Sequence, residues 1–223
     1  MTQHYFITGT GTGVGKTFVT CALLHTLKAQ GIAAIGMKPI AAGAEPSPDG
    51  LRNEDIEALR EASGVKLASE DLNCYLMAEA IAPHIAAANE EIDIDFDVIR
   101  QRFDQLAELA DTVLVEGVGG FIVPLGDGVD TADLAADLDL PVILVVGMRL
   151  GCLNHALLTQ EAIRARGLTL AGWVANQIDP NMAEFDANVD ALEERIRAPL
   201  LAVIEFQKNA DPSKVEIDIE SLS

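Results

Sequence analysis

The sequence is poor in cysteine and in positive charge, and each shortage excludes a class of protein. Its three cysteines, Cys21, Cys74 and Cys152, lie far apart, so neither a disulfide framework nor a metal-binding cysteine pair is indicated. Lysine and arginine number 15 against 35 aspartate and glutamate, giving a net charge of −20. Because nucleic acids and anionic membranes repel such a surface, we expect neither as a partner.

Long apolar runs and a targeting segment are also missing. The apolar stretches are too short to cross a bilayer as a helix. A predicted strand begins within four residues of the first methionine, which leaves no room for a signal peptide. The acidic runs 90–97 and 130–139 favour solvated faces over a metal site. We therefore expect a reduced, cytoplasmic protein.

What the chain does contain is a regular alternation of apolar strands and amphipathic helices. Apolar residues make up 49% of 223 residues, enough for a substantial core, and we predict one domain over 1–223. Nearly unbroken apolar runs predict strands at 5–7, 32–38, 112–116, 141–147, 171–176 and 200–204. Helical spacing predicts helices at 17–30, 53–63, 96–110, 154–166 and 184–197. This order predicts an α/β fold with a doubly wound, mainly parallel sheet flanked by helices, although segment 41–95 stays largely unassigned.

A glycine-rich loop at residues 9–17 is the strongest functional motif. It reads Gly-Thr-Gly-Thr-Gly-Val-Gly-Lys-Thr between the first strand and the first helix. Glycines let backbone N–H groups converge on phosphate oxygens, and the helix N-terminus adds partial positive charge. Lys16 can reach the terminal phosphates and Thr17 can bind Mg²⁺. The loop predicts a phosphate-loop NTPase fold that binds a nucleoside triphosphate.

Polar residues recur where other strands end. Glu116 closes a strand before Gly117 to Gly120, as an acidic Mg²⁺ ligand of phosphate-loop enzymes would. Lys38 follows a buried run and either extends to solvent or faces an anion. Asn176 is equally compatible with purine binding and with an ordinary turn. Asp55 opens a helix, where an acid often only complements the dipole. Ligands collect beyond the carboxyl ends of parallel strands, so these residues predict one shared site.

Several separated motifs, taken together, resemble the dethiobiotin synthase family over residues 1 to about 204. They are the loop at 8–17, Lys38-Pro39, Gly50-Leu51-Arg52-Asn53 with Asp55, Pro83-His84, 115–120, 150–155 and Gly172-Trp173-Val174-Ala175-Asn176. The resemblance implies an ATP- and Mg²⁺-dependent cyclo-ligase of biotin biosynthesis. Its substrates would be ATP, CO₂ or bicarbonate and 7,8-diaminopelargonic acid, which closes to a cyclic urea through a carbamate and a mixed anhydride.

The resemblance also implies a role for individual residues. Lys38, Thr12 and Lys16 would be catalytic, and Thr17, Asp55 and Glu116 would hold Mg²⁺. Thr12, Lys38, Ala42 and Asn154 would bind substrate, the last from the partner subunit of a homodimer. The nucleotide-binding positions would be Gly13, Val14, Gly15, Lys16, Thr17, Phe18, Asp55, Glu116, Gly117, Val118, Gly119, Asn176, Gln177, Glu205, Phe206 and Gln207.

Departures from the family pattern leave alternatives open. Many members carry acids where this loop has Gly11 and Gly13, a hydroxyl residue where this chain has Ala42, and proline where it has Glu205. An ATP-binding homologue with reduced catalysis is one alternative. A partner-regulated ATPase switch of the same fold is another, although such switches place a lysine early in the loop.

Overall fold

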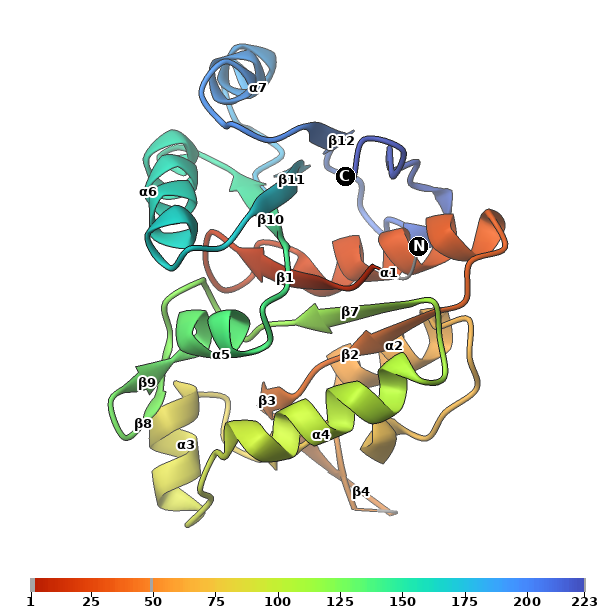
Figure 1. Ribbon diagram of the computed structural model, residues 1–223. Coiled ribbons are helices and arrows are strands. Elements are labelled where there is room, and N and C mark those ends of the chain that lie inside the picture. Colours follow the sequence, from red (N-terminus) through yellow and green to blue (C-terminus); the bar gives the residue numbers. More distant parts are fainter. Residues whose placement is uncertain (1–2, 49, 223) are drawn as a thin grey trace.

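A six-stranded parallel sheet organises the chain in the computed structural model, which describes residues 3–48 and 50–222 (Figure 1). The strands lie in the order β12-β11-β10-β1-β7-β2, and every neighbouring pair is parallel. Their bounds are Tyr5–Gly9 for β1, Ala34–Met37 for β2, Thr112–Glu116 for β7, Val142–Met148 for β10, Leu170–Gln177 for β11 and Leu200–Ile204 for β12. The predicted α/β fold with its doubly wound parallel sheet is confirmed.

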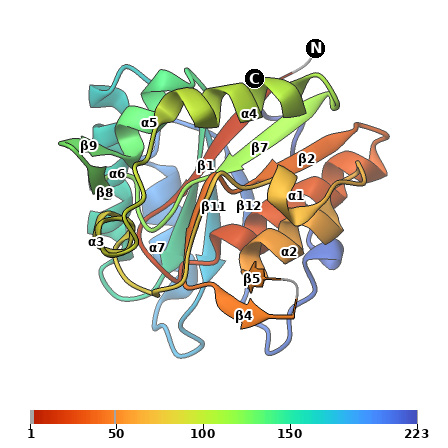
Figure 2. The same cartoon turned by 90° about the horizontal axis from the view of Figure 1, so that it is seen from below.

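Helices cover both faces of this sheet. In Figure 2, α4 (Phe96–Ala107) and α5 (Thr131–Asp137) lie on one side of the strands, and α1 (Lys16–Ala29) and α2 (Glu54–Ala62) lie on the other. The helices α3 (Pro83–Asn89), α6 (Cys152–Ala165) and α7 (Phe185–Glu193) pack their apolar side chains into the same cluster as α4 and α5. No helix in the described ranges is both long and apolar enough to span a bilayer.

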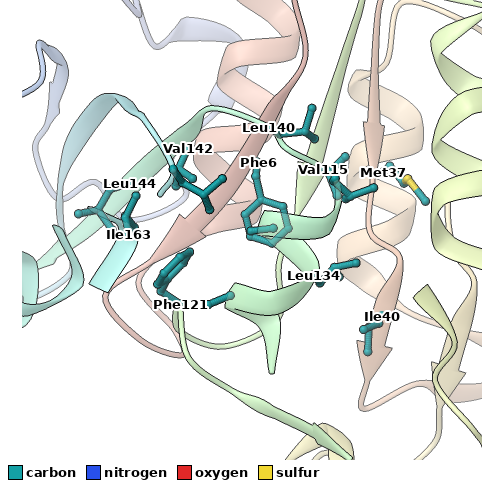
Figure 3. Close-up of a cluster of buried hydrophobic side chains, with 14 of the residues drawn as sticks. Phe6, Met37, Ile40, Val115, Phe121, Leu134, Leu140, Val142, Leu144 and Ile163 are labelled. Carbon is teal, nitrogen blue, oxygen red and sulfur yellow. The ribbon is translucent and has the colours of Figure 1, made fainter. Parts of the chain in front are cut away.

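Strand alternation divides the core into two clusters. Phe6 packs under α4, α5 and α6, together with the residues drawn in Figure 3, whereas its neighbours Tyr5 and Ile7 pack under α1. Successive side chains of a strand point to opposite faces, so a run that is apolar throughout must be covered on both. All five residues of β1 are buried accordingly.

The helix boundaries differ from the sequence-based ones by a few residues, for local reasons. Helix α1 ends at Ala29 because Gly31 adopts a left-handed conformation, with φ of 78°. The N–H of Ile32 then donates to the Leu27 carbonyl at 3.0 Å, which takes Ile32 out of the next strand. Helix α2 begins after Asn53, whose side chain accepts from the N–H groups of Asp55 and Ile56.

Sequence reasoning missed the small elements. Three two-stranded sheets pair β3 (Ile40–Ala42) with β6 (Tyr75–Met77), β4 (Glu45–Ser47) with β5 (Gly50–Arg52), and β8 (Pro124–Gly126) with β9 (Val129–Asp130). Two short 3₁₀ helices lie at Ser69–Asp71 and Pro212–Lys214, and α3 and α5 also went unpredicted. Segments of two to seven residues are too short to show a period of their own.

The acidic run 130–139 is not merely a solvated face. Asp130 caps α5 by accepting from the N–H groups of Ala132 and Asp133. Arg166, just after α6, bonds both Asp130, at 2.8 Å, and Asp133. Part of the run therefore fastens α5 to the end of α6.

The C-terminal segment folds back over α1. The 3₁₀ helix Pro212–Lys214 packs on α1, and the Asp218 N–H donates to the Leu201 carbonyl at 2.9 Å. Ile217 is buried in the same cluster as Ile7 and Leu24. This segment completes the cover of one sheet face.

Replacing Ile217 should test that contribution. Ile217→Ala is expected to lower the free energy of unfolding by about 2–5 kcal/mol, because it leaves a cavity in the core. The neighbouring exposed Glu216→Ala should change it by less than about 0.5 kcal/mol. Denaturant titration of both variants measures the difference. An equal loss of unfolding free energy in the two variants would show that Ile217 does not contribute to the core.

Candidate active site

The loop between β1 and α1 leaves backbone donors free for an anion. Gly13 and Gly15 have φ of 73° and 88°, and Gly15 is the N-cap of α1 without any side-chain hydrogen bond. The N–H groups of residues 13–18 find no acceptor within the described part of the chain. Orphaned donors at a helix start, next to a dipole of the right sign, form a phosphate-binding cradle.

Lys16 spans from this loop to the loop after β7. Its Nζ donates to the Gly119 carbonyl at 2.6 Å and lies 3.4 Å from the Gly11 carbonyl. Burial disfavours its charged form and lowers its pKa to about 8, although Glu116 opposes this shift. The two carbonyls hold the amine where the free N–H groups of the loop converge.

Glu116 is fully buried at the end of β7 and accepts three hydrogen bonds. Its Oε1 lies 2.6 Å from Lys38 Nζ and accepts from the Thr17 hydroxyl at 2.7 Å. Its Oε2 accepts from the Thr20 hydroxyl at 2.9 Å. A carboxylate without access to water depends on such partners, because an unpaired buried charge is very costly.

Lys38 joins Glu116 to Asp55. Its side chain is 6% exposed, and its Nζ lies 2.9 Å from Asp55 Oδ2 as well. Burial acts to lower the pKa of Lys38, but the two carboxylates outweigh it and the pKa is raised. The pKa of Asp55 is lowered, because Lys38 outweighs its desolvation. The structure thus brings Lys38 and Asp55, whose roles sequence reasoning had left ambiguous, into contact with each other and with Glu116.

These groups border one cavity of about 350 Å³. It is lined by Thr12, Gly13, Gly15, Lys16, Thr17, Lys38, Ala42, Asp55, Glu116, Val118 and Gly119. The donors are a hydroxyl and two carboxylates, which fit Mg²⁺ because that ion takes oxygen ligands and keeps several waters and phosphate oxygens. No group of three or more His, Cys, Asp or Glu side chains suited to a metal occurs among residues 3–48 and 50–222.

The residues expected around the base lie beside the loop. The Asn176 Nδ2 donates to the Val14 carbonyl at 2.8 Å, and a Cβ on Gly15 would lie 2.2 Å from that nitrogen. Gln177 Oε1 accepts from the Phe206 N–H at 3.0 Å, which ties β11 to the exposed segment after β12 that includes Glu205 and Gln207. Asn176 thus supports the loop with its amide, in addition to any contact with a base.

A few of the residues predicted to bind nucleotide or substrate do not present a side chain to the cavity. The Val14 side chain is buried, so a nucleotide could meet only its main chain, whereas the half-buried Phe18 side chain packs against the core. Gly117 packs near the Phe6 ring, where a Cβ would lie 3.1 Å from it. Asn154 is exposed on α6 and does not line the cavity of its own chain.

Sequence reasoning missed two supports of the site. Thr20 contacts Glu116, and its only signal was a hydroxyl one helical turn after Lys16. Asn73 donates through Nδ2 to the Lys38 carbonyl at 2.7 Å, and the Lys38 N–H donates to the Leu72 carbonyl at 2.8 Å. These contacts hold the turn that presents Lys38.

The lowered pKa of Lys16 generates a prediction about proton uptake. With a pKa of about 8, much of Lys16 is neutral at pH 8.5, and phosphate oxygens would favour its charged form. Triphosphate binding should therefore take up a proton at pH 8.5, and affinity should fall as the pH rises above 8. Calorimetry in two buffers of different ionisation enthalpy measures the uptake.

Lys16→Arg is the control for this measurement. It should bind more weakly and show no buffer dependence, because a guanidinium keeps its proton at this pH. A wild-type binding enthalpy that is the same in both buffers would contradict the prediction.

Comparison with known proteins agrees with this geometry. A family model described as an AAA domain matches residues 3–214. Among solved structures, the MinD cell division protein of Aquifex aeolicus superposes with a TM-score of 0.58 at 16% identity, covering 95% of this chain and 86% of that one. The septum site-determining protein MinD of Pyrococcus horikoshii, complexed with Mg-ADP, reaches 0.56 at 19% identity, covering 92% and 82%. At these identities the likeness shows the fold alone.

Curated relatives are much closer in sequence. The ATP-dependent dethiobiotin synthetase BioD of Aromatoleum aromaticum is 58% identical, covering 96% of this chain and 95% of the relative. The protein of the same name from Nitrosospira multiformis is 54% identical, covering 95% and 92%, and that from Xanthomonas oryzae pv. oryzae is 46% identical, covering 93% and 92%. With such identity over nearly its whole length, the chain belongs to the ATP-dependent dethiobiotin synthetase family.

Proposed function

We propose that this protein closes a cyclic urea on 7,8-diaminopelargonic acid with CO₂ and ATP, giving dethiobiotin, ADP and phosphate. The observation that carries the proposal is the position of Lys38, buried between Glu116 and Asp55 in the wall of the cavity that the phosphate loop forms. A cation held there, opposite Lys16, faces the space between a terminal phosphate and an acceptor bound beside it. We take the identity of this phosphoryl acceptor, the carbamate of the diamine, from the family to which the chain belongs.

The chemistry needs little from the protein except charge and position. One amine of the substrate adds to CO₂ and loses a proton, which gives a carbamate. A carbamate oxygen then attacks the γ-phosphorus and releases ADP, and the second amine attacks the carbonyl carbon and expels phosphate. Expelling oxide from a carbamate is prohibitive, so phosphorylation is the step that makes ring closure possible. Lys16 and Lys38 would stabilise negative charge on the transferring group.

Thr17, Asp55 and Glu116 would hold the divalent cation. Because the Thr17 hydroxyl donates its proton to Glu116, its oxygen lone pairs are left for a metal. When bound, Mg²⁺ would neutralise charge on the phosphate oxygens. The nucleotide base would lie beside Asn176, Gln177 and the segment 205–207.

Substrate binding in this chain would differ in detail from many relatives. Ala42 lines the cavity and offers no hydroxyl, and Gly13 contributes no side chain. Thr12 and Lys38 remain to meet the carbamate. The loss of one neutral hydrogen bond would weaken binding by about 0.5–1.5 kcal/mol, which leaves the reaction itself accessible.

A homodimer would complete the substrate site. Asn154 is exposed on α6 and does not line the cavity of its own chain. Leu158, also on α6, is 62% exposed, and Leu150, just before the helix, is 96% exposed. Apolar side chains this exposed favour burial against a second copy. In that arrangement Asn154 would reach the partner's substrate. We place the enzyme in the cytoplasm, where its three cysteines would stay free, as they are here.

Phosphate release tests the proposed reaction directly. With ATP and Mg²⁺ present, release should be slow with the diamine alone or bicarbonate alone and fast with both, since only the pair forms a carbamate. A coupled phosphate assay measures all four combinations. Release that ignores the diamine would refute the synthase function and favour a switch ATPase, whereas nucleotide binding without release would favour a homologue with reduced catalysis.

Lys38→Gln should separate catalysis from nucleotide binding. The amide can still donate to Glu116 but carries no charge, so kcat should fall by about 10²–10³-fold while ADP affinity changes little. Steady-state kinetics and calorimetry provide the two readouts. The exposed Lys28→Gln in the last turn of α1 is the matched control. A Lys38→Gln enzyme of normal kcat would remove Lys38 from the mechanism.

A further inference from the structure

Thr20 is a fully buried hydroxyl that the proposed mechanism does not use. It lies on α1, one helical turn after Lys16, and is 0% exposed. Its Oγ1 lies 2.9 Å from Glu116 Oε2 and 2.9 Å from the Lys16 carbonyl oxygen. It neither lines the cavity nor reaches the space where a phosphate would bind.

Two acceptors therefore compete for one hydroxyl proton. A hydrogen bond to a carboxylate is charge-assisted and roughly twice as strong as one to a neutral carbonyl. The Lys16 carbonyl, moreover, is the ordinary i→i−4 acceptor of the helical N–H of Thr20. Glu116 Oε2, by contrast, has no donor other than Thr20 among residues 3–48 and 50–222. The proton therefore goes to Glu116.

This contact determines which oxygen of Glu116 faces the site. Oε1 already serves Lys38 and Thr17, and Oε2 is held on the opposite side by Thr20. The terminal torsion of a glutamate side chain is soft, so a carboxylate released at one oxygen can rotate. Rotation would misalign Oε1 with both of its partners.

We propose that Thr20 is a positioning residue, whose hydroxyl fixes the Glu116 carboxylate so that Oε1 is presented to Lys38, Thr17 and the divalent cation. The inference rests on the proposed function in so far as that cation accompanies a bound nucleotide. Removing the Thr20 hydroxyl should therefore change how strongly Mg²⁺ increases nucleotide affinity, and this can be measured without turnover.

The same helix provides a matched control. Thr26 Oγ1 lies 2.9 Å from the Ala22 carbonyl oxygen, the same distance as Thr20 Oγ1 has from the Lys16 carbonyl oxygen, and it bonds no carboxylate among residues 3–48 and 50–222. Valine preserves the branched shape of threonine and removes the hydroxyl. Thr20→Val and Thr26→Val therefore both remove a hydroxyl that lies against the i−4 carbonyl of α1, but only Thr20→Val removes a hydrogen bond to Glu116.

The experiment compares ADP binding with Mg²⁺ and with EDTA by calorimetry, alongside thermal unfolding. Thr20→Val should lose about tenfold of the Mg²⁺-dependent gain in affinity, as expected for a bond to a charged group, and keep its metal-free affinity. Thr20→Ser should restore most of the gain, and Thr26→Val should match the wild type. If Thr20→Val does not fold, Thr20→Ala is measured in the same way.

Two outcomes would overturn the proposal. One is an unchanged Mg²⁺ response in Thr20→Val or Thr20→Ala, and the other is an equal loss in Thr26→Val. The synthase function is judged separately, by phosphate release from the wild type. A wild type without diamine-dependent release, combined with a weakened Mg²⁺ response in Thr20→Val, would support the positioning role and refute only the reaction.

Discussion

The carboxylate of Glu116 is the group on which the site depends, because a charge withdrawn from water must be matched by fixed partners. Lys38, Thr17 and Thr20 supply them from a strand end and from two positions on the first helix. The hydrogen bonds that stabilise the buried carboxylate therefore also fix the positions of these three side chains. Asp55 enters through Lys38 rather than through Glu116, so α2 joins the site by an ion pair at its N-terminus.

Charge balance explains why so many ionised groups can share a small space. Lys16 and Lys38 offset Glu116 and Asp55, and the cluster is close to neutral before a ligand arrives. The two lysines respond differently to burial. The pKa of Lys16 falls to about 8, whereas the pKa of Lys38 is raised because it lies between two carboxylates.

The sheet itself does not distinguish this enzyme from other proteins of its fold. MinD proteins share the architecture with less than 20% identity, and in open parallel sheets generally ligands bind outside the carboxyl ends of the strands. What characterises the chain is the set of side chains there: Lys38 after β2 and Glu116 at the end of β7, beside the phosphate loop.

The sequence by itself determined the parallel sheet, the phosphate loop and the family, because strand periodicity, glycine spacing and ordered motifs are local properties of the chain. It also pointed to Glu116. Only the tertiary structure decided that Lys38 pairs with Asp55 and Glu116 rather than extending to water, since their separation along the chain carries no distance information. The hydrogen bond from Asn73 to the Lys38 carbonyl and the contact of Thr20 with Glu116 could not be predicted either, because each joins residues that become neighbours only in the folded chain. The short paired strands were missed for another reason, since each is too short to show a period.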